Sequence, residues 1–125
     1  KLSIFDEELK LRNMAADYYR NNIDGNLKNP FIPKDYLSSW AQYSLLAESE
    51  FEREEIMLTL SNSNIPSMIY YKTSLHLQSV YKSLGYKVAD FPVSEDTSSR
   101  IFSIPMHPYL EDYQQDLVLE ALFDE

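Results

Sequence analysis

The sequence predicts an α+β domain in which helices cover a small, mainly antiparallel sheet. Helical and extended patterns alternate only loosely along the chain, and the extended segments are too few for a large sheet. The 125 residues are 44% apolar and 14% aromatic, which suffices for one hydrophobic core. Because no internal repeat is visible, residues 1–125 are expected to form a single domain.

The first segment, residues 4–23, has the apolar spacing of a helix. Its apolar face is formed by Ile4, Leu11, Ala15 and Tyr18. A stop signal at Asp24-Gly25-Asn26 and a proline-containing connector over residues 27–39 follow. Residues 40–46 then alternate between apolar and polar, which predicts a half-buried strand that begins at Trp40.

A second helix is expected over residues 50–62, because Ser49 and Glu52 form a capping-box pattern. Phe51 and Leu58 are predicted to face the core. Bulky residues over 67–71 predict a short strand. A short helix is expected over 75–84, with Gly85 at its C-cap.

Two more helices are expected in the last third of the chain. Asp90-Phe91-Pro92 predicts an extended or turn element, and Ser94 is suited to cap a helix that runs to about residue 102. Residues 87–89 and 102–104 are candidates for one or two further strands. The final helix is expected over 110–123, with an apolar stripe of Leu110, Tyr113, Leu117 and Ala121.

The charge and composition exclude several classes of function. A net charge of −9 argues against nucleic-acid partners and against docking to anionic membranes. The chain has no cysteine, so disulfides and thiolate chemistry are excluded. With no apolar run long enough to span a bilayer and no signal segment, a cytoplasmic protein is the default expectation. The first residue is Lys rather than Met, which indicates a processed product or an excised segment.

The residues that carry chemistry do not form a complete active site by themselves. His76 and His107 lack metal-chelating partners at helical spacing; each ring is suited to acid–base work, or else His76 starts a helix and His107 is a turn residue between prolines. On a strand, Tyr70 and Tyr71 would point to opposite faces, one into the core and one to a pocket edge. Arg100 is a substrate clamp or, as the favoured alternative, part of a structural ion pair.

An ordered series of short motifs nevertheless runs over almost the whole chain. In chain order they are Arg12 with Ala15-Ala16-Asp17-Tyr18-Tyr19, Trp40, Ile65-Pro66-Ser67, Tyr70-Tyr71, Leu75-His76-Leu77-Gln78, Tyr81, Gly85-Tyr86, Asp90-Phe91-Pro92, Ser94-Glu95, Arg100 and Ser103-Ile104-Pro105-Met106-His107-Pro108. Each motif is weak alone, but the ordered set closely resembles the C-terminal segment of the DegT/DnrJ/EryC1/StrS aminotransferases, enzymes that use pyridoxal phosphate (PLP).

The resemblance implies the C-terminal small domain of a fold-type I enzyme that transfers an amino group, with glutamate as the expected donor, to a nucleotide-linked keto sugar in surface-glycan or deoxyaminosugar biosynthesis. In this family a large-domain lysine, near a Ser-Phe-x-x-x-Lys-type segment, holds PLP, and an Asp pairs with its pyridine nitrogen. Nothing in this chain matches either element, so no cofactor is expected here and the chain is expected to be inactive alone.

The partners implied are the PLP-binding large domain of the same polypeptide, the nucleotide-sugar and amino-acid substrates, and a second subunit in a homodimer of the intact enzyme. Tyr71 and His76 are expected nearest the substrate cleft, with His76 bonded to a carboxylate or a phosphate. The alternative is a free-standing interaction or regulatory domain derived from such an enzyme.

The sequence departs from the family pattern at four positions. Asn64 and Ala89 stand where the family tends to have Gly, and Lys72 and Ser74 replace prolines. The lost prolines are expected to loosen the loop that leads to His76.

Overall fold

The computed structural model describes residues 2–123, which form an α+β domain. The helices are η1 (Leu2–Ile4), α1 (Phe5–Asn22), α2 (Glu50–Asn62), η2 (Leu75–Leu77), η3 (Ser79–Leu84), α3 (Pro92–Arg100) and α4 (Asp112–Phe123), where η marks a 3-10 helix, and the strands are β1 (Tyr43–Leu46) and β2 (Ile101–Ile104). The predicted fold class is confirmed.

The sheet is antiparallel and small. β1 pairs with β2 in the register that sets Tyr43 opposite Ile104. Single bridges widen the sheet on both edges: Lys28 exchanges backbone hydrogen bonds with Leu46 at 2.9 and 3.1 Å, and Met68 does so with Ser103 at 3.0 and 2.8 Å. Loop segments therefore cover both edges of the sheet over the bridged residues, although they do not form strands of their own.

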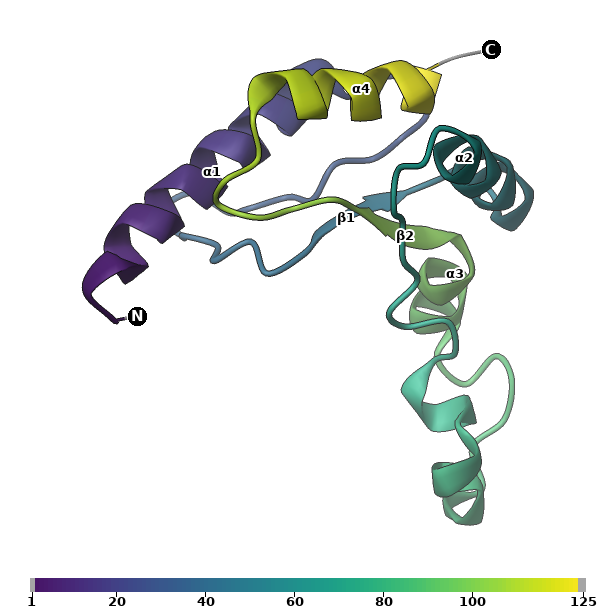
Figure 1. Cartoon of the computed structure of the whole chain (residues 1–125). Helices are drawn as coiled ribbons and strands as arrows, with labels where there is room; N and C mark the ends of the chain where they lie inside the picture. Colours follow the sequence, from purple (N-terminus) through teal and green to yellow (C-terminus); the bar gives the residue numbers. More distant parts are fainter. Residues whose placement is uncertain (1, 124–125) are drawn as a thin grey trace.

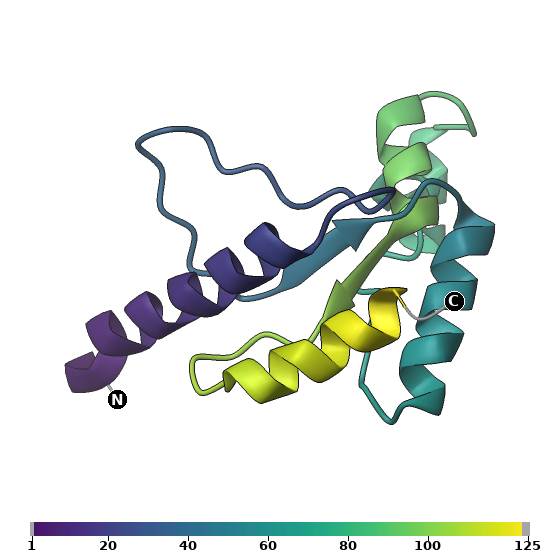
Figure 2. The same ribbon diagram turned by 90° about the horizontal axis from the view of Figure 1, so that it is seen from above.

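The core lies between one face of this sheet and the helices α1, α2 and α4. Figures 1 and 2 show α1 and α4 on the same side of the strands, and α4 contacts both α1 and α2. Tyr43 and Leu45 of β1 and Phe102 of β2 are fully buried on this face. Tyr19 of α1 packs against Tyr43 with ring centroids 5.1 Å apart, so aromatic contacts join the first helix to the sheet.

Residues 70–99 form an arm that projects away from the sheet (Figure 1). The arm contains η2, η3 and α3 except its last residue, and Ser74 is the one residue within it that is buried. Most of its large apolar side chains remain exposed, including Val80, Leu84 and Val88 at 71%, 64% and 74%. The arm therefore has no core of its own beyond a small cluster of rings described below.

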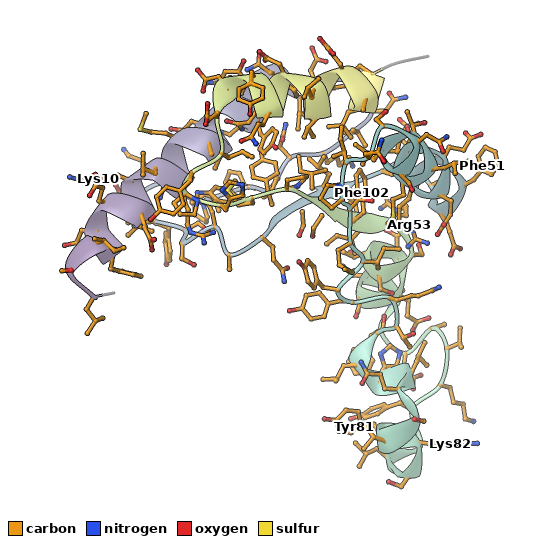
Figure 3. The ribbon with its side chains drawn as sticks, viewed as in Figure 1. Lys10, Phe51, Arg53, Tyr81, Lys82 and Phe102 are labelled. Carbon is orange, nitrogen blue, oxygen red and sulfur yellow. The ribbon has the colours of Figure 1, made fainter. Side chains whose placement is uncertain are left out.

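The prediction for the buried face of α2 was wrong. Phe51 and Leu58 are 71% and 62% exposed, and Phe51 points away from the body (Figure 3). Arg53 and Leu60 are buried instead, at 1% and 0% exposure. The two residues of each pair are seven positions apart, so helical periodicity alone does not decide which pair faces the core. Arg53 faces inward because its guanidinium donates to the Ser98 carbonyl of α3 at 3.3 Å.

The stripe predicted for α4 was also partly wrong. Tyr113 and Leu117 are 59% and 53% exposed, whereas Ala121 is buried as expected. The buried face of α4 includes Val118 and Leu122 together with Gln115, whose amide donates to the Ala15 carbonyl of α1 at 2.9 Å. A side-chain hydrogen bond thus turns this helix toward α1. On the face predicted for residues 4–23, Ala15 of α1 is buried as predicted, but Ile4, which lies in η1, is 40% exposed.

The first strand begins later than predicted because Trp40 has a left-handed backbone. Its φ is +48°, which interrupts an extended segment. The Trp40 indole N–H donates to Asn13 Oδ1 at 3.0 Å, and the Trp40 carbonyl accepts from Arg12 at 2.8 Å. These bonds to α1 hold the bend, and β1 starts at Tyr43.

Three further predictions in the second half of the chain were corrected. Residues 67–71 are no strand but make the single bridge at Met68, next to a proline and a turn. Residues 87–89 form a turn, since Ala89 has φ of +75°. Residues 75–84 form two 3-10 helices rather than one helix, although Gly85 ends η3 in the left-handed conformation as predicted.

α3 begins earlier and ends earlier than predicted. Pro92 occupies its first turn and Phe91 precedes it, so Ser94 does not cap this helix. The helix ends at Arg100, and residues 101–104 form β2, which confirms the candidate strand at 102–104.

Candidate functional site

The two residues singled out from the sequence, Tyr71 and His76, both lie on the arm. Tyr71 stands in the turn at the root of the arm and is 65% exposed. His76 lies in η2, with its side chain only 7% exposed. Tyr70 is also 54% exposed, so the expectation that one ring of the Tyr70-Tyr71 pair enters the core was wrong.

Two hollows flank one wall of the arm. The larger, of about 830 Å³, is lined by Tyr71 and by residues of α3. The smaller, of about 350 Å³, is lined by His76, Tyr81 and Tyr86. Leu75, Phe91 and Ser94 line both hollows. Tyr71 and His76 thus lie on opposite sides of a shared wall, and each borders a space open to solvent.

Glu95 of α3 connects His76 to the turn before that helix. Its Oε1 lies 3.0 Å from His76 Nε2. The backbone N–H of Ala89 donates to both Glu95 oxygens at 3.0 Å, and the N–H of Phe91 donates to Oε1 at 3.3 Å. These donors, the Ala89 N–H foremost, lower the pKa of Glu95 below its ordinary value, so the group is a carboxylate at neutral pH.

Three rings pack together above this carboxylate. The His76 ring lies 4.8 Å from that of Phe91 and 6.3 Å from that of Tyr86, and Tyr86 meets Phe91 edge-on at 5.4 Å. The packing and the bond to Glu95 together fix the plane of the imidazole. His76 is therefore pre-oriented toward the smaller hollow, as a ligand-contacting residue needs to be.

Sequence reasoning missed the pairing of Glu95 with His76. The two residues are 19 apart in the sequence and lie in different helices, so the spacing patterns within one helix do not predict that they meet. Arg100 forms an ion pair with Asp96, one turn earlier in α3, and donates to the Ala47 carbonyl at 2.6 Å. The favoured expectation of a structural ion pair at Arg100 is thereby confirmed.

His107 is a turn residue, which agrees with one of its two alternatives. It is exposed, and its Nδ1 accepts from the Tyr109 N–H at 3.2 Å. It does not line either hollow of the arm. Within residues 2–123, no group of three or more His, Asp or Glu side chains is placed to hold a metal ion.

The lysines within residues 2–123 do not fit a site that binds a carbonyl cofactor. Over residues 2–123 every lysine is exposed, and none lines the two hollows of the arm. Such a lysine needs an enclosed setting that lowers its pKa. No helix in the described part of the chain is long and apolar enough to cross a membrane.

Known proteins resemble this chain over nearly its whole length. The family model described as "DegT/DnrJ/EryC1/StrS aminotransferase family" matches residues 1–123. The chain is 30% identical over 123 residues to a UDP-2-acetamido-2-deoxy-3-oxo-D-glucuronate aminotransferase of Pseudomonas aeruginosa, covering 98% of this chain and 33% of that protein. It is 38% identical over 81 residues to a "Pleiotropic regulatory protein" of Geobacillus stearothermophilus, covering 65% and 21%.

Among solved structures, a DegT DnrJ EryC1 StrS aminotransferase from Brucella abortus superposes with a TM-score of 0.86 at 40% identity, covering 97% of this chain and 32% of that one. The chain thus spans about a third or less of the length of these relatives. The ordered motifs, the fold and the match over nearly every residue agree, and the chain belongs to the DegT/DnrJ/EryC1/StrS aminotransferase family.

Proposed function

We propose that this chain is the C-terminal small domain of a PLP-dependent aminotransferase that transfers an amino group from an amino acid, with glutamate as donor, to a nucleotide-linked keto sugar. The product would enter surface-glycan or deoxyaminosugar biosynthesis. The observation that carries the proposal is the family match over residues 1–123, combined with a relative of three times the length that is named as a sugar-nucleotide aminotransferase.

In this proposal Tyr71 and His76 contact the substrates from the arm. Both border hollows that are open to solvent, and the arm projects from the body with its apolar side chains uncovered. A second domain placed against the arm would turn these open hollows into an enclosed cleft, in which polar contacts are stronger than in water.

The cofactor in this proposal is held by the large domain of the same polypeptide, outside this chain, and the intact enzyme is a homodimer. PLP serves as the electron sink for amino-group transfer when bound. The exposed lysines among residues 2–123 support this division, because none of them has the enclosed setting that a cofactor-binding lysine needs. Alone, this chain would lack transaminase activity.

The test compares this chain with the polypeptide translated from the whole reading frame that contains residues 1–125. Both are incubated with PLP, reduced with borohydride and weighed by mass spectrometry. We expect saturable attachment of one PLP per chain only in the longer protein, together with glutamate-dependent amination of a nucleotide-linked keto sugar. Stoichiometric labelling of one lysine within residues 1–125 would contradict the proposal.

A second candidate is a free-standing interaction or regulatory domain derived from such an enzyme. The name of the Geobacillus stearothermophilus relative, a pleiotropic regulatory protein, favours it. The two candidates differ in the gene: a start codon directly before Lys1 with no large domain upstream would support the regulatory candidate, whereas a continuous reading frame through a PLP-binding domain would eliminate it.

A further inference from the structure

The two nitrogens of the His76 ring have different surroundings. Nε2 is engaged by Glu95 at 3.0 Å. Nδ1 has no hydrogen-bond partner among the described residues, yet it is not sealed from water. Within residues 2–123 the buried side-chain atoms that lack a partner are Tyr19 Oη and Arg53 Nε. Nδ1 is therefore a solvent-accessible polar atom on a side chain that is only 7% exposed.

The Glu95 contact decides which nitrogen carries the proton. An ionised carboxylate only accepts hydrogen bonds, so Nε2 has to be the donor. Glu95 is held ionised by the N–H groups of Ala89 and Phe91, which lower its pKa. A neutral imidazole has one N–H, and with that N–H on Nε2 the open Nδ1 is an acceptor.

The hollow that His76 borders has no lysine or arginine in its lining. Besides His76, its lining consists of Leu75, Leu84 and Phe91 together with the hydroxyl-bearing Tyr81, Tyr86 and Ser94. The lysines of the arm, Lys72, Lys82 and Lys87, are exposed elsewhere on its surface. An acceptor nitrogen beside hydroxyl groups, with a carboxylate directly behind it and no lysine or arginine in the lining, suits a neutral donor and disfavours an anion.

We propose that His76 Nδ1 accepts a hydrogen bond from a neutral donor, a sugar hydroxyl or N-acetyl N–H, and that this hollow does not take a phosphate or carboxylate. Glu95 is the positioning residue that presents Nδ1. The proposal rests on the proposed function, since a sugar is what that reaction would bring to the arm. It is an alternative to the expectation that His76 binds a carboxylate or a phosphate.

The first experiment measures the protonated nitrogen directly. Long-range proton–nitrogen NMR spectra of the ¹⁵N-labelled chain, at about pH 8 and so above the ordinary histidine pKa of about 6.5, are expected to show His76 with its proton on Nε2. Glu95→Gln removes the charge but keeps the shape, and is expected to shift His76 toward a mixture of both tautomers. A proton on Nδ1 in the unmodified chain overturns the proposal.

The second experiment identifies the ligand class. N-acetyl-D-glucosamine is expected to shift the His76 ring signals with a dissociation constant on the order of 10 mM, and inorganic phosphate is not. His107, exposed and outside both hollows, serves as the internal control and should not move with either. His76→Phe keeps a ring against Phe91 and is expected to abolish the sugar-dependent shifts of Tyr86.

The possible results distinguish a failure of the His76 proposal from a failure of the proposed function. An equal or larger response to phosphate overturns the proposal, and so does the absence of any response to both ligands. Failure of the longer polypeptide to transfer amino groups would contradict the proposed function alone, because it changes neither the position of the His76 proton nor the response of the ring to the sugar.

Discussion

Two of the four departures from the family pattern sit at backbone positions with left-handed geometry. Asn64 has φ of +58° and Ala89 has φ of +75°, and both stand where the family tends to have Gly. Asn tolerates this region because its side chain can form local hydrogen bonds with the backbone. Ala has no such hydrogen bonds to offset the clash between its Cβ and the backbone carbonyl oxygen. Ala89 holds this geometry while its N–H donates to both oxygens of Glu95. The strain thus lies in the turn that positions His76.

Ala89→Gly is expected to raise the free energy of unfolding by about 1 kcal/mol, because glycine has no Cβ to clash at positive φ. The matched control is Gly85→Ala, at φ of +79° with nothing within 4 Å of the added Cβ. It is expected to lower the free energy of unfolding by about 1 kcal/mol for the same reason. Urea denaturation measures both, and two changes of the same sign would contradict the argument.

The lowered pKa of Glu95 makes part of the stability depend on pH. Because the pKa is lower in the folded than in the unfolded chain, this contribution is present above the unfolded pKa and is lost as pH falls through the folded one. The stability advantage of the unmodified chain over Glu95→Gln is therefore expected to shrink between about pH 5 and pH 3. Acid unfolding curves of the two proteins measure this difference. If the advantage of the unmodified chain grew as the pH fell, Glu95 would not have a lowered pKa in the folded chain.

At the scale of elements, α2 and α3 are joined through a buried arginine. Arg53 is 1% exposed, donates to the Ser98 carbonyl of α3, and forms ion pairs with Glu50 and Glu54 on its own helix. Both carboxylates are more than half exposed, so removing the arginine leaves no buried, unpaired charge behind. The aliphatic stem of Arg53 supplies packing that an apolar residue of similar length can replace.

Arg53→Ala is expected to lower the free energy of unfolding by about 3 kcal/mol through the cavity it leaves, and Arg53→Met by about 1 kcal/mol or less. Leu58→Ser on the exposed face of the same helix is the control, with an expected effect within about 0.5 kcal/mol. Chemical denaturation monitored by Trp40 fluorescence gives all three values. Equal losses for Arg53→Ala and Arg53→Met would show that the charge, not the packing, matters.

At the scale of the whole molecule, the body is a packed domain and the arm is not. Figure 3 shows Tyr81 and Lys82 at the far end of the arm, distant from the core residue Phe102. The apolar side chains along the arm form an uncovered surface of the kind that marks an interaction site or promotes association. The chain in isolation therefore exposes apolar area that a partner domain would cover.

We expect this chain to self-associate through the arm as its concentration rises. Leu84→Ser, at a residue that is 64% exposed near the tip, is expected to shift the sedimentation-velocity average toward the monomer. Leu117→Ser, at a residue 53% exposed on α4, is the control and should leave association unchanged. A monomer at every concentration, or equal effects of the two variants, would rule out the arm as the associating surface.

The sequence by itself determined the fold class, the family and most helix positions, because capping residues, prolines, glycines and ordered motifs act over a few neighbours. Only the tertiary structure decided that Arg53 rather than Phe51 faces the core, since both stripes share the helical period and a contact with α3 selects between them. It likewise brought Glu95 to His76 across 19 residues, because the arm folds back on itself and the turn at Ala89 sets the carboxylate behind the ring.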